Sequence, residues 1–254
     1  MLAVSRRNAV MELLTEKKNV TVIELAKLFD VTDETIRRDL KLLEQQGLLV
    51  KTHGGAFIQD GATNDINISI RDGAFLDSKA KIAQEATRLI HNGDSIFLDC
   101  STTSFHIGNA VRNKRITVIT NSLKISSVLA SYDNIRLIVM GGVLNRTHMC
   151  YVGQGTLQNL SNYFVDKAFI SCRSLSIQHG ITDSNENMAE VRSLILNHAS
   201  SVYLVADYTK FGKTSFVSIG SFQKLTGLIT DKPLSEEWID CLNANNVLYY
   251  FPNE

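Results

Sequence analysis

The stretch VTDETIRRDL, residues 31–40, sets two adjacent arginines, Arg37 and Arg38, on a short amphipathic segment. Thr32 is placed to cap a helix that we expect to run from Asp33 to about Gln46. At about 100° per residue, the apolar side chains share one side of this helix and the charged side chains spread over the other. The apolar stripe consists of Ile36, Leu40 and Leu43. Both arginines are therefore expected to face outward.

Two further helices precede the arginine helix. Residues 5–18 and residues 21–29 both carry apolar side chains at helical spacing. Thr21 caps the second of them, and Glu24 stands three residues later, as in a capping box. Only the short turn DVT separates this second helix from the arginine helix, which we expect to stop at Gly47.

A basic hairpin follows, because LLVKTHGGAF turns at Gly54-Gly55 between expected strands at 48–50 and 56–58. This order of elements describes a winged helix-turn-helix, assigned to residues 1–58, which lays one helix in the major groove of DNA. Arginines there can bind guanine or phosphate, a threonine can bind a base or phosphate, and basic residues of the hairpin can reach the backbone or the minor groove. The candidate DNA-contacting residues are Thr32, Glu34, Thr35, Arg37, Arg38, Lys41, Lys51 and His53.

A solvated amphipathic helix is the alternative reading of the arginine segment, but the order of the surrounding elements favours DNA binding. The acidic residues of this module nearly cancel its basic ones. Affinity for DNA comes largely from phosphate neutralisation, so a single copy is expected to bind weakly. We therefore expect a homo-oligomer, a dimer or a tetramer, that reads paired half-sites in double-stranded operator DNA.

Residues 59–77 mix Gly, Asn and Asp without sustained periodicity, and we interpret them as a linker. Beyond them, in residues 78–254, short apolar runs alternate with helical patterns. This alternation predicts an α/β domain with a mostly parallel sheet covered on both faces. The expected strands include SIFLDC, RITVIT, IRLIVM, KAFISC, SVYLVA, GLIT and VLYYF.

Sheets of this kind bind ligands at the carboxyl ends of their strands, and polar or glycine residues follow several of the expected strands. Hydroxyls next to a helix start suit a phosphate, carboxylates can hold sugar hydroxyls, and a lysine can neutralise a phosphate. Helix capping and surface exposure are the alternative roles for these residues. The candidate effector-binding residues are Asp99, Ser101, Thr102, Thr103, Asn121, Ser122, Gly141, Gly142, Asp183, Glu190, Asp207 and Lys210.

The motifs VTDETIRRDL and LEQQGLLVKTHGGA resemble the signature of the DeoR family of bacterial regulators. The resemblance covers nearly the whole chain and extends to the segments DCSTT, TNSL, GGVL, GITD and DYTKFG. It implies an effector domain like ribose-phosphate isomerase, DNA contacts by Thr35, Arg37 and Arg38, and a helix-stabilising role for Asp39. It also implies a phosphorylated sugar or related metabolite as effector. The chain departs from the family pattern at Ser101, at Arg192 and in the segment FISCRS.

We therefore expect a repressor of a carbohydrate-utilisation operon that a phosphorylated sugar releases or modulates. A sugar-phosphate isomerase with a DNA-binding appendage is the alternative, because a pocket for either role needs the same acids and lysine. No catalytic residue, no cofactor and no metal site is expected, since the four cysteines and six histidines lack ligand spacing. The absence of a secretory signal and of a long apolar stretch predicts a cytoplasmic protein without a membrane partner.

Overall fold

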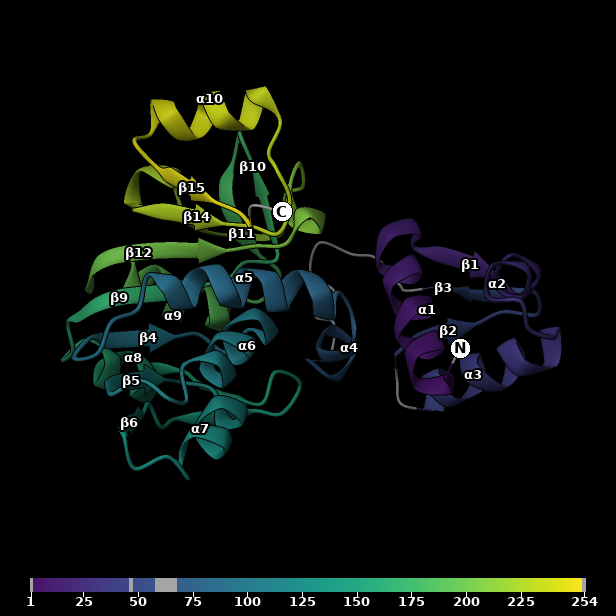
Figure 1. Cartoon of the computed structure of the whole chain (residues 1–254), viewed down its shortest axis with the longest axis horizontal. Helices are drawn as coiled ribbons and strands as arrows, with labels where there is room; N and C mark the ends of the chain where they lie inside the picture. Colours follow the sequence, from purple (N-terminus) through teal and green to yellow (C-terminus); the bar gives the residue numbers. More distant parts are fainter. Residues whose placement is uncertain (1, 46–47, 58–67, 253–254) are drawn as a thin grey trace. The chain divides into compact units, whose positions relative to one another are not determined.

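The computed structural model describes residues 2–45, 48–57 and 68–252 of the 254-residue chain. The chain divides into two compact units, Met1–Leu76 and Asp77–Glu254 (Figure 1). Gly47 and Ile58, at which we expected an element to end, lie outside the described residues, as do residues 59–67 of the expected linker. A short helix, α4 (Ile68–Gly73), occupies the last part of that linker range.

The first unit is a helical module closed by a small antiparallel sheet. The predicted helices and hairpin are present, and the strand order of the sheet is β1-β3-β2. Strand β1 was not predicted, and it places the segment before α2 against the hairpin. The apolar faces of α1, α2 and α3 pack on one another and on the sheet in a single core. The elements are α1 (Ala3–Lys17), β1 (Asn19–Thr21), α2 (Val22–Phe29), α3 (Asp33–Gln45), β2 (Val50–Lys51) and β3 (Gly55–Phe57).

Gly55 explains how this sheet closes. A Cβ atom at this position would lie 2.0 Å from the carbonyl oxygen of Val20, so only glycine lets β3 approach β1 this closely. The neighbouring Gly54 has open space around its Cα, but its carbonyl accepts a hydrogen bond from the N–H of Val22 at 2.8 Å. The turn between the hairpin strands is thereby held against the start of α2.

The second unit is built on a seven-stranded parallel sheet of order β15-β14-β12-β9-β4-β5-β6. All seven expected strands are present in it, which confirms the predicted mostly parallel α/β domain. The order reverses direction between β4 and β9, which pair with each other. The strands are β4 (Ser95–Leu98), β5 (Ile116–Thr120), β6 (Ile135–Val139), β9 (Val165–Ile170), β12 (Ala199–Val205), β14 (Gly227–Ile229) and β15 (Leu248–Tyr250).

Two hydrophobic cores cover the two faces of this sheet, as the alternation of side chains on β4 shows. Ile96 and Leu98 pack with α5, α6 and α7, whereas Phe97 packs on the opposite face with residues of α8, α9 and α10. Figure 1 shows α5, α6 and α7 together in front of the sheet. The helices are α5 (Leu76–Arg88), α6 (Thr102–Ala110), α7 (Leu123–Leu129), α8 (Gln154–Leu160), α9 (Glu186–Ile195) and α10 (Glu236–Ala244).

Two small antiparallel additions, neither of them predicted, complete the unit. One is a sheet of order β10-β11-β13, and the other is the hairpin β7-β8. Within the described ranges, no helix is long and apolar enough to cross a membrane. Nor do three or more His, Cys, Asp or Glu side chains of this part of the chain gather as a metal site. The added strands are β7 (Val143–Asn145), β8 (Cys150–Val152), β10 (Ser174–Ser176), β11 (Gly180–Asp183) and β13 (Val217–Gly220).

Candidate functional site

The helix α3 presents its polar face to solvent, as the helical wheel predicts. Thr32 caps it, because the N–H of Thr35 donates to the Thr32 hydroxyl at 3.3 Å, and the two hydroxyls lie 2.9 Å apart. Of the candidate DNA contacts, Thr35 is half-buried in this cap. Glu34, Arg37, Arg38 and Lys41 are exposed along the helix.

The hairpin is attached to α3 through two hydrogen bonds. The Nη1 of Arg37 donates to the carbonyl of His53 at 3.3 Å, and the N–H of Lys51 donates to Oε1 of Glu44 at 3.0 Å. The side chain of His53 itself is exposed, and Lys51 is half-buried. Arg37 therefore holds the tip of the hairpin beside the helix, so that His53 lies next to Arg37 of α3.

Asp39 anchors α3 to α1. Its carboxylate is buried and accepts from the Nε of Arg6 at 2.6 Å and from the Nη1 of Arg7 at 3.4 Å. An acid at this position of the helix is buried together with the apolar stripe, so it needs a cation from a neighbouring element. These ion pairs tie α3 to α1.

In the second unit, Asp99 lies at the carboxyl end of β4, beside the point where the strand order reverses. Its carboxylate is 1% exposed and accepts four hydrogen bonds. The N–H of Ser101 donates at 3.0 Å, the hydroxyl of Ser104 at 2.6 Å, the N–H of Ser171 at 3.0 Å and the Nε of Arg192 at 2.7 Å. Asp99 thus joins the end of β4 to the end of β9 and to α9.

Arg192 bridges two of the predicted effector carboxylates. It projects from α9, is itself buried, and pairs through Nε with Asp99 and through Nη1 with Asp183. Burial raises the pKa of Asp99, but the Arg192 charge and the hydrogen bonds from Ser101, Ser104 and Ser171 outweigh it, so the pKa is lowered. The sequence identified Arg192 only as a departure from the family pattern, and its two partners follow from the tertiary fold.

The hydroxyls that follow β4 and β5 act as helix caps. Ser101 accepts from the N–H of Ser104 at 3.0 Å, and Ser122 accepts from the N–H of Ile125 at 3.3 Å. The capping role that the sequence left open is therefore present at both loops. Thr102 and Thr103, in the first turn of α6, are buried as well.

Asn121, at the end of β5, is 1% exposed, and its Nδ2 donates to the carbonyl of Tyr151 at 3.0 Å. In the part of the chain that the structure describes, its Oδ1 accepts no hydrogen bond. A buried amide oxygen without a donor is costly, and such a group calls for a partner.

Asp207 and Lys210 lie at the carboxyl end of β12. Asp207 accepts from the N–H of Thr209 at 3.0 Å, and Lys210 Nζ lies 3.9 Å from its other oxygen. Burial raises the pKa of Asp207, but Lys210, Thr209 and Lys79 together outweigh it and lower the pKa. Cys172, after β9, is buried near these charged groups. Burial raises the pKa of its thiol to about 12, against the opposing charges of Lys210 and Arg192.

Lys79 also acts on Asp207, and we did not predict it as a site residue. It is a lysine of α5 that is only 3% exposed. A signal existed in the sequence, because Ile82, Ala83 and Ala86 stand three, four and seven positions later, which places Lys79 on the buried stripe of the helix.

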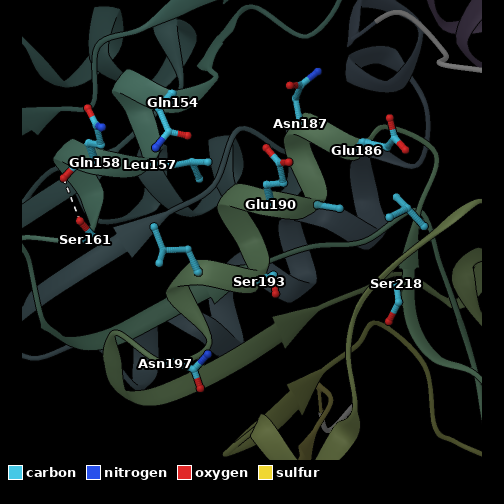
Figure 2. A pocket seen from close by; sticks show the side chains of 13 residues that line it. Gln154, Leu157, Gln158, Ser161, Glu186, Asn187, Glu190, Ser193, Asn197 and Ser218 are labelled. Carbon is cyan, nitrogen blue, oxygen red and sulfur yellow. Dashed lines mark hydrogen bonds between the residues drawn. The ribbon is translucent and has the colours of Figure 1, made fainter.

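Two other sets of candidates, Gly141 with Gly142 and Glu190, make different contacts. A Cβ atom on Gly142 would lie 2.1 Å from Oγ1 of Thr156, so this glycine allows close packing against α8, whereas a Cβ atom on Gly141 would meet nothing within 4 Å. The Thr156 hydroxyl donates to the carbonyl of Gly141 at 2.9 Å. Glu190 is exposed on α9 and lines an open groove of about 860 Å³ between α8, α9 and β13. Figure 2 shows Glu190 between Asn187 and Ser193, with Gln154 and Gln158 of α8 across the groove.

Comparisons with known proteins place the chain in a family. Residues 6–61 match the family model of the DeoR-like helix-turn-helix domain, and residues 75–232 match that of the DeoR C terminal sensor domain. The regulator YulB of Bacillus subtilis is 34% identical over 97% of this chain and 96% of its own length. The transcriptional repressor GlcR of the same species is 33% identical, over 94% and 92%. The glycerol-3-phosphate regulon repressor of Escherichia coli is 28% identical over 92% of each chain.

Solved structures overlap only in part. Ribose 5-phosphate isomerase A from Methanocaldococcus jannaschii covers 53% of this chain and 54% of its own, with a TM-score of 0.39 and 20% identity. The delta subunit of eIF2B from Chaetomium thermophilum covers 60% and 56%, with a TM-score of 0.45 and 15% identity. The family assignment rests instead on the sequence matches, which span both units and name regulators, not enzymes. The chain belongs to the DeoR family of DNA-binding transcriptional regulators.

Proposed function

We propose that this regulator is a repressor of a carbohydrate-utilisation operon and that a phosphorylated sugar, bound at the strand-end cluster of the second unit, releases it from operator DNA. The cluster consists of Asp99, Asn121, Asp183, Arg192, Asp207 and Lys210, together with Lys79. The name of the relative GlcR describes a repressor, and another relative is called a glycerol-3-phosphate regulon repressor. A third relative, at 32% identity, is called an L-fucose operon activator, so the direction of regulation needs its own test.

The unpaired Oδ1 of Asn121 is the observation that carries the effector site. It is a buried acceptor at the carboxyl edge of the sheet, and a sugar hydroxyl is a donor that would satisfy it. The ammonium groups of Lys79 and Lys210 act on Asp207 from two elements and supply positive charge for a phosphate. The carboxylates of Asp99 and Asp183 are fixed by Arg192, so their part is to hold the edge in shape.

On the DNA side, we propose that α3 enters the major groove, with Arg38 and Lys41 on bases or phosphates. Arg37 and Thr35 have internal partners, the hairpin tip and the helix cap, so they contact DNA while also fixing the helix. Lys51 and His53 extend the contact to the adjacent backbone. Because the charges of the module nearly cancel, we propose that the protein binds as a homo-oligomer on paired half-sites.

Thermal unfolding of the full chain against phosphorylated sugars and their unphosphorylated parents tests the effector. A ligand at about 100 times its Kd adds roughly 2.7 kcal/mol, which raises the midpoint of a unit this size by about 5–10 °C. We expect one phosphorylated compound to give this shift and Asn121→Leu to reduce it. That compound should then weaken binding to a duplex selected by the protein from a random pool. Binding of the compound without an effect on DNA affinity would rule it out as the effector.

The DNA contacts are tested on the same selected duplex. Arg38→Ala should weaken binding and reduce the slope of log affinity against log salt by about 1 if the arginine contacts a phosphate. If Arg38 reads a base, the loss should instead be confined to the selected sequence. Arg136→Ala, on the exposed side of β6, is the matched control and should leave both quantities unchanged. Equal affinities for the Arg38 and Arg136 variants would contradict the placement of α3 in the groove.

A further inference from the structure

An open groove of about 660 Å³ runs between α5 and α6. Its walls come from Gln84, Thr87 and Arg88 of α5, from His106 and Asn109 of α6, and from the segment that enters β5. That segment leads into the amino end of a strand, whereas the strand-end cluster follows carboxyl ends. None of the cluster residues lines the groove, so it is a separate site.

Two cations at the groove are held by neutral oxygens. Arg112 donates from Nε to the carbonyl of Asn109 at 2.7 Å and from Nη1 to the hydroxyl of Tyr132 at 3.1 Å. Lys114 is half-buried and donates from Nζ to the carbonyl of Ile90 at 2.6 Å. These contacts orient both cations without cancelling their charge.

The remaining lining agrees with a positive site. The ten described residues that line the groove include no aspartate or glutamate. Arg88 pairs with Glu85 at 2.6 Å, so its charge is balanced and the excess comes from Arg112 and Lys114. Gln84 and Asn109 add amides, and Ala80 and Ala83 add a small apolar surface.

We propose that the α5–α6 groove is a second ligand site that binds a small molecule carrying a phosphate group. Paired cations recognise phosphate, and the amides suit the hydroxyl or carbonyl groups of the rest of the molecule. The volume lies in the range of small-molecule sites, and a concave site lined in part by alanines suits a compact ligand better than an extended polyanion. The site is independent of the proposed effector site at the strand ends.

Calorimetric titration of the full chain with inorganic pyrophosphate, at constant ionic strength set by chloride, tests this proposal. Loss of one charged hydrogen bond typically weakens binding about tenfold or more. We therefore expect the double variant Arg112→Gln, Lys114→Gln to raise the Kd at least tenfold, and Arg136→Gln, on the exposed side of β6, to leave it unchanged. Lys210→Gln, in the strand-end cluster, reports on pyrophosphate bound at the other proposed site. A Kd that rises only in the Lys210 variant would overturn the groove and leave the effector proposal standing. Absence of pyrophosphate binding to the wild type would also overturn it.

A charge series at Gln84 covers the case in which the double variant fails to fold. Gln84 is exposed on α5 at the groove wall, so its replacement removes no buried contact. Gln84→Glu should weaken pyrophosphate binding about two- to fivefold, and Gln84→Lys should strengthen it by a similar factor. Affinities that do not follow the sign of the charge would refute the site. If the double variant changes the affinity for the duplex and leaves the affinity for pyrophosphate unchanged, Arg112 and Lys114 bind DNA. That result would overturn the proposal of a small-molecule ligand.

Discussion

Removing the charge of Arg192 is expected to destabilise the second unit by about 3–5 kcal/mol, because the variant Arg192→Met leaves two carboxylates buried without their cation. The side chains of Arg192, Asp99 and Asp183 are 3%, 1% and 5% exposed, so water cannot replace the lost partner. For a unit of this size, about 2–4 °C is lost per kcal/mol, and the second unit should unfold roughly 6–20 °C lower. Differential scanning calorimetry of the full chain measures this, with unfolding of the first unit as an internal reference.

The pH dependence of that loss separates an electrostatic cause from a packing cause. In the wild type the pKa of Asp99 is lowered, so its contribution is present above the ordinary aspartate pKa and is lost as the pH falls through the folded value. In the variant, burial and the neighbouring carboxylate raise the pKa of Asp99. The stability gap between the two proteins should therefore widen from pH 4.5 to pH 7.5. Arg136→Met, on an exposed position of β6, should change stability by less than about 0.5 kcal/mol. A gap that is equal at both pH values would refute the reasoning.

Three further predictions concern single residues. Asp39→Ala should lower the stability of the first unit by about 3 kcal/mol, measured calorimetrically, because it leaves the buried Arg6 without its carboxylate. Gly55→Ala should abolish duplex binding in a mobility shift, since its Cβ would collide with a β1 carbonyl, whereas Gly54→Ala, which meets nothing within 4 Å, should bind normally. In alkylation at pH 8.5 followed by mass spectrometry, half-buried Cys241 should react before Cys172, because burial raises the pKa of the Cys172 thiol to about 12. Equal reaction rates would contradict that protection.

Local sequence signals predicted the elements whose stability is local. The Thr21 hydroxyl accepts from the N–H of Glu24 at 3.1 Å, so this helix start could be identified from its capping residue. The second half of the predicted capping box differs from the expectation, because the Glu24 side chain pairs with Lys17. Strand β1 could not be predicted, because three residues become a strand only by pairing with β3, more than thirty positions later. The antiparallel pairing of β11 with β13 is hidden for the same reason.

The same contrast between local signals and long-range contacts applies to the candidate effector site. Its positions could be predicted, because the carboxyl ends of parallel strands meet at one edge of the sheet. Its bonds could not, since they depend on which face of α9 turns inward: Arg192 is buried and Glu190, two residues before it, is exposed. The burial of Lys79 on α5 could have been predicted from a helical wheel. A lysine flanked by alanines suggests an exposed position unless the wheel shows that it lies on the apolar stripe.

The bonds at the strand ends give a physical reason why this edge suits sensing more than proton transfer. A general base needs a free lone pair and a pKa near the working pH, but Asp99 accepts four hydrogen bonds and its pKa is lowered. The pKa of Asp207 is lowered as well, and Asp183 is bound to Arg192. The proposed effector therefore binds through the open acceptor of Asn121 and through the lysines, while the carboxylates keep their bonds. It changes DNA affinity only if its free energy of binding differs between two arrangements of the edge, and the effect of the ligand on duplex binding measures that difference.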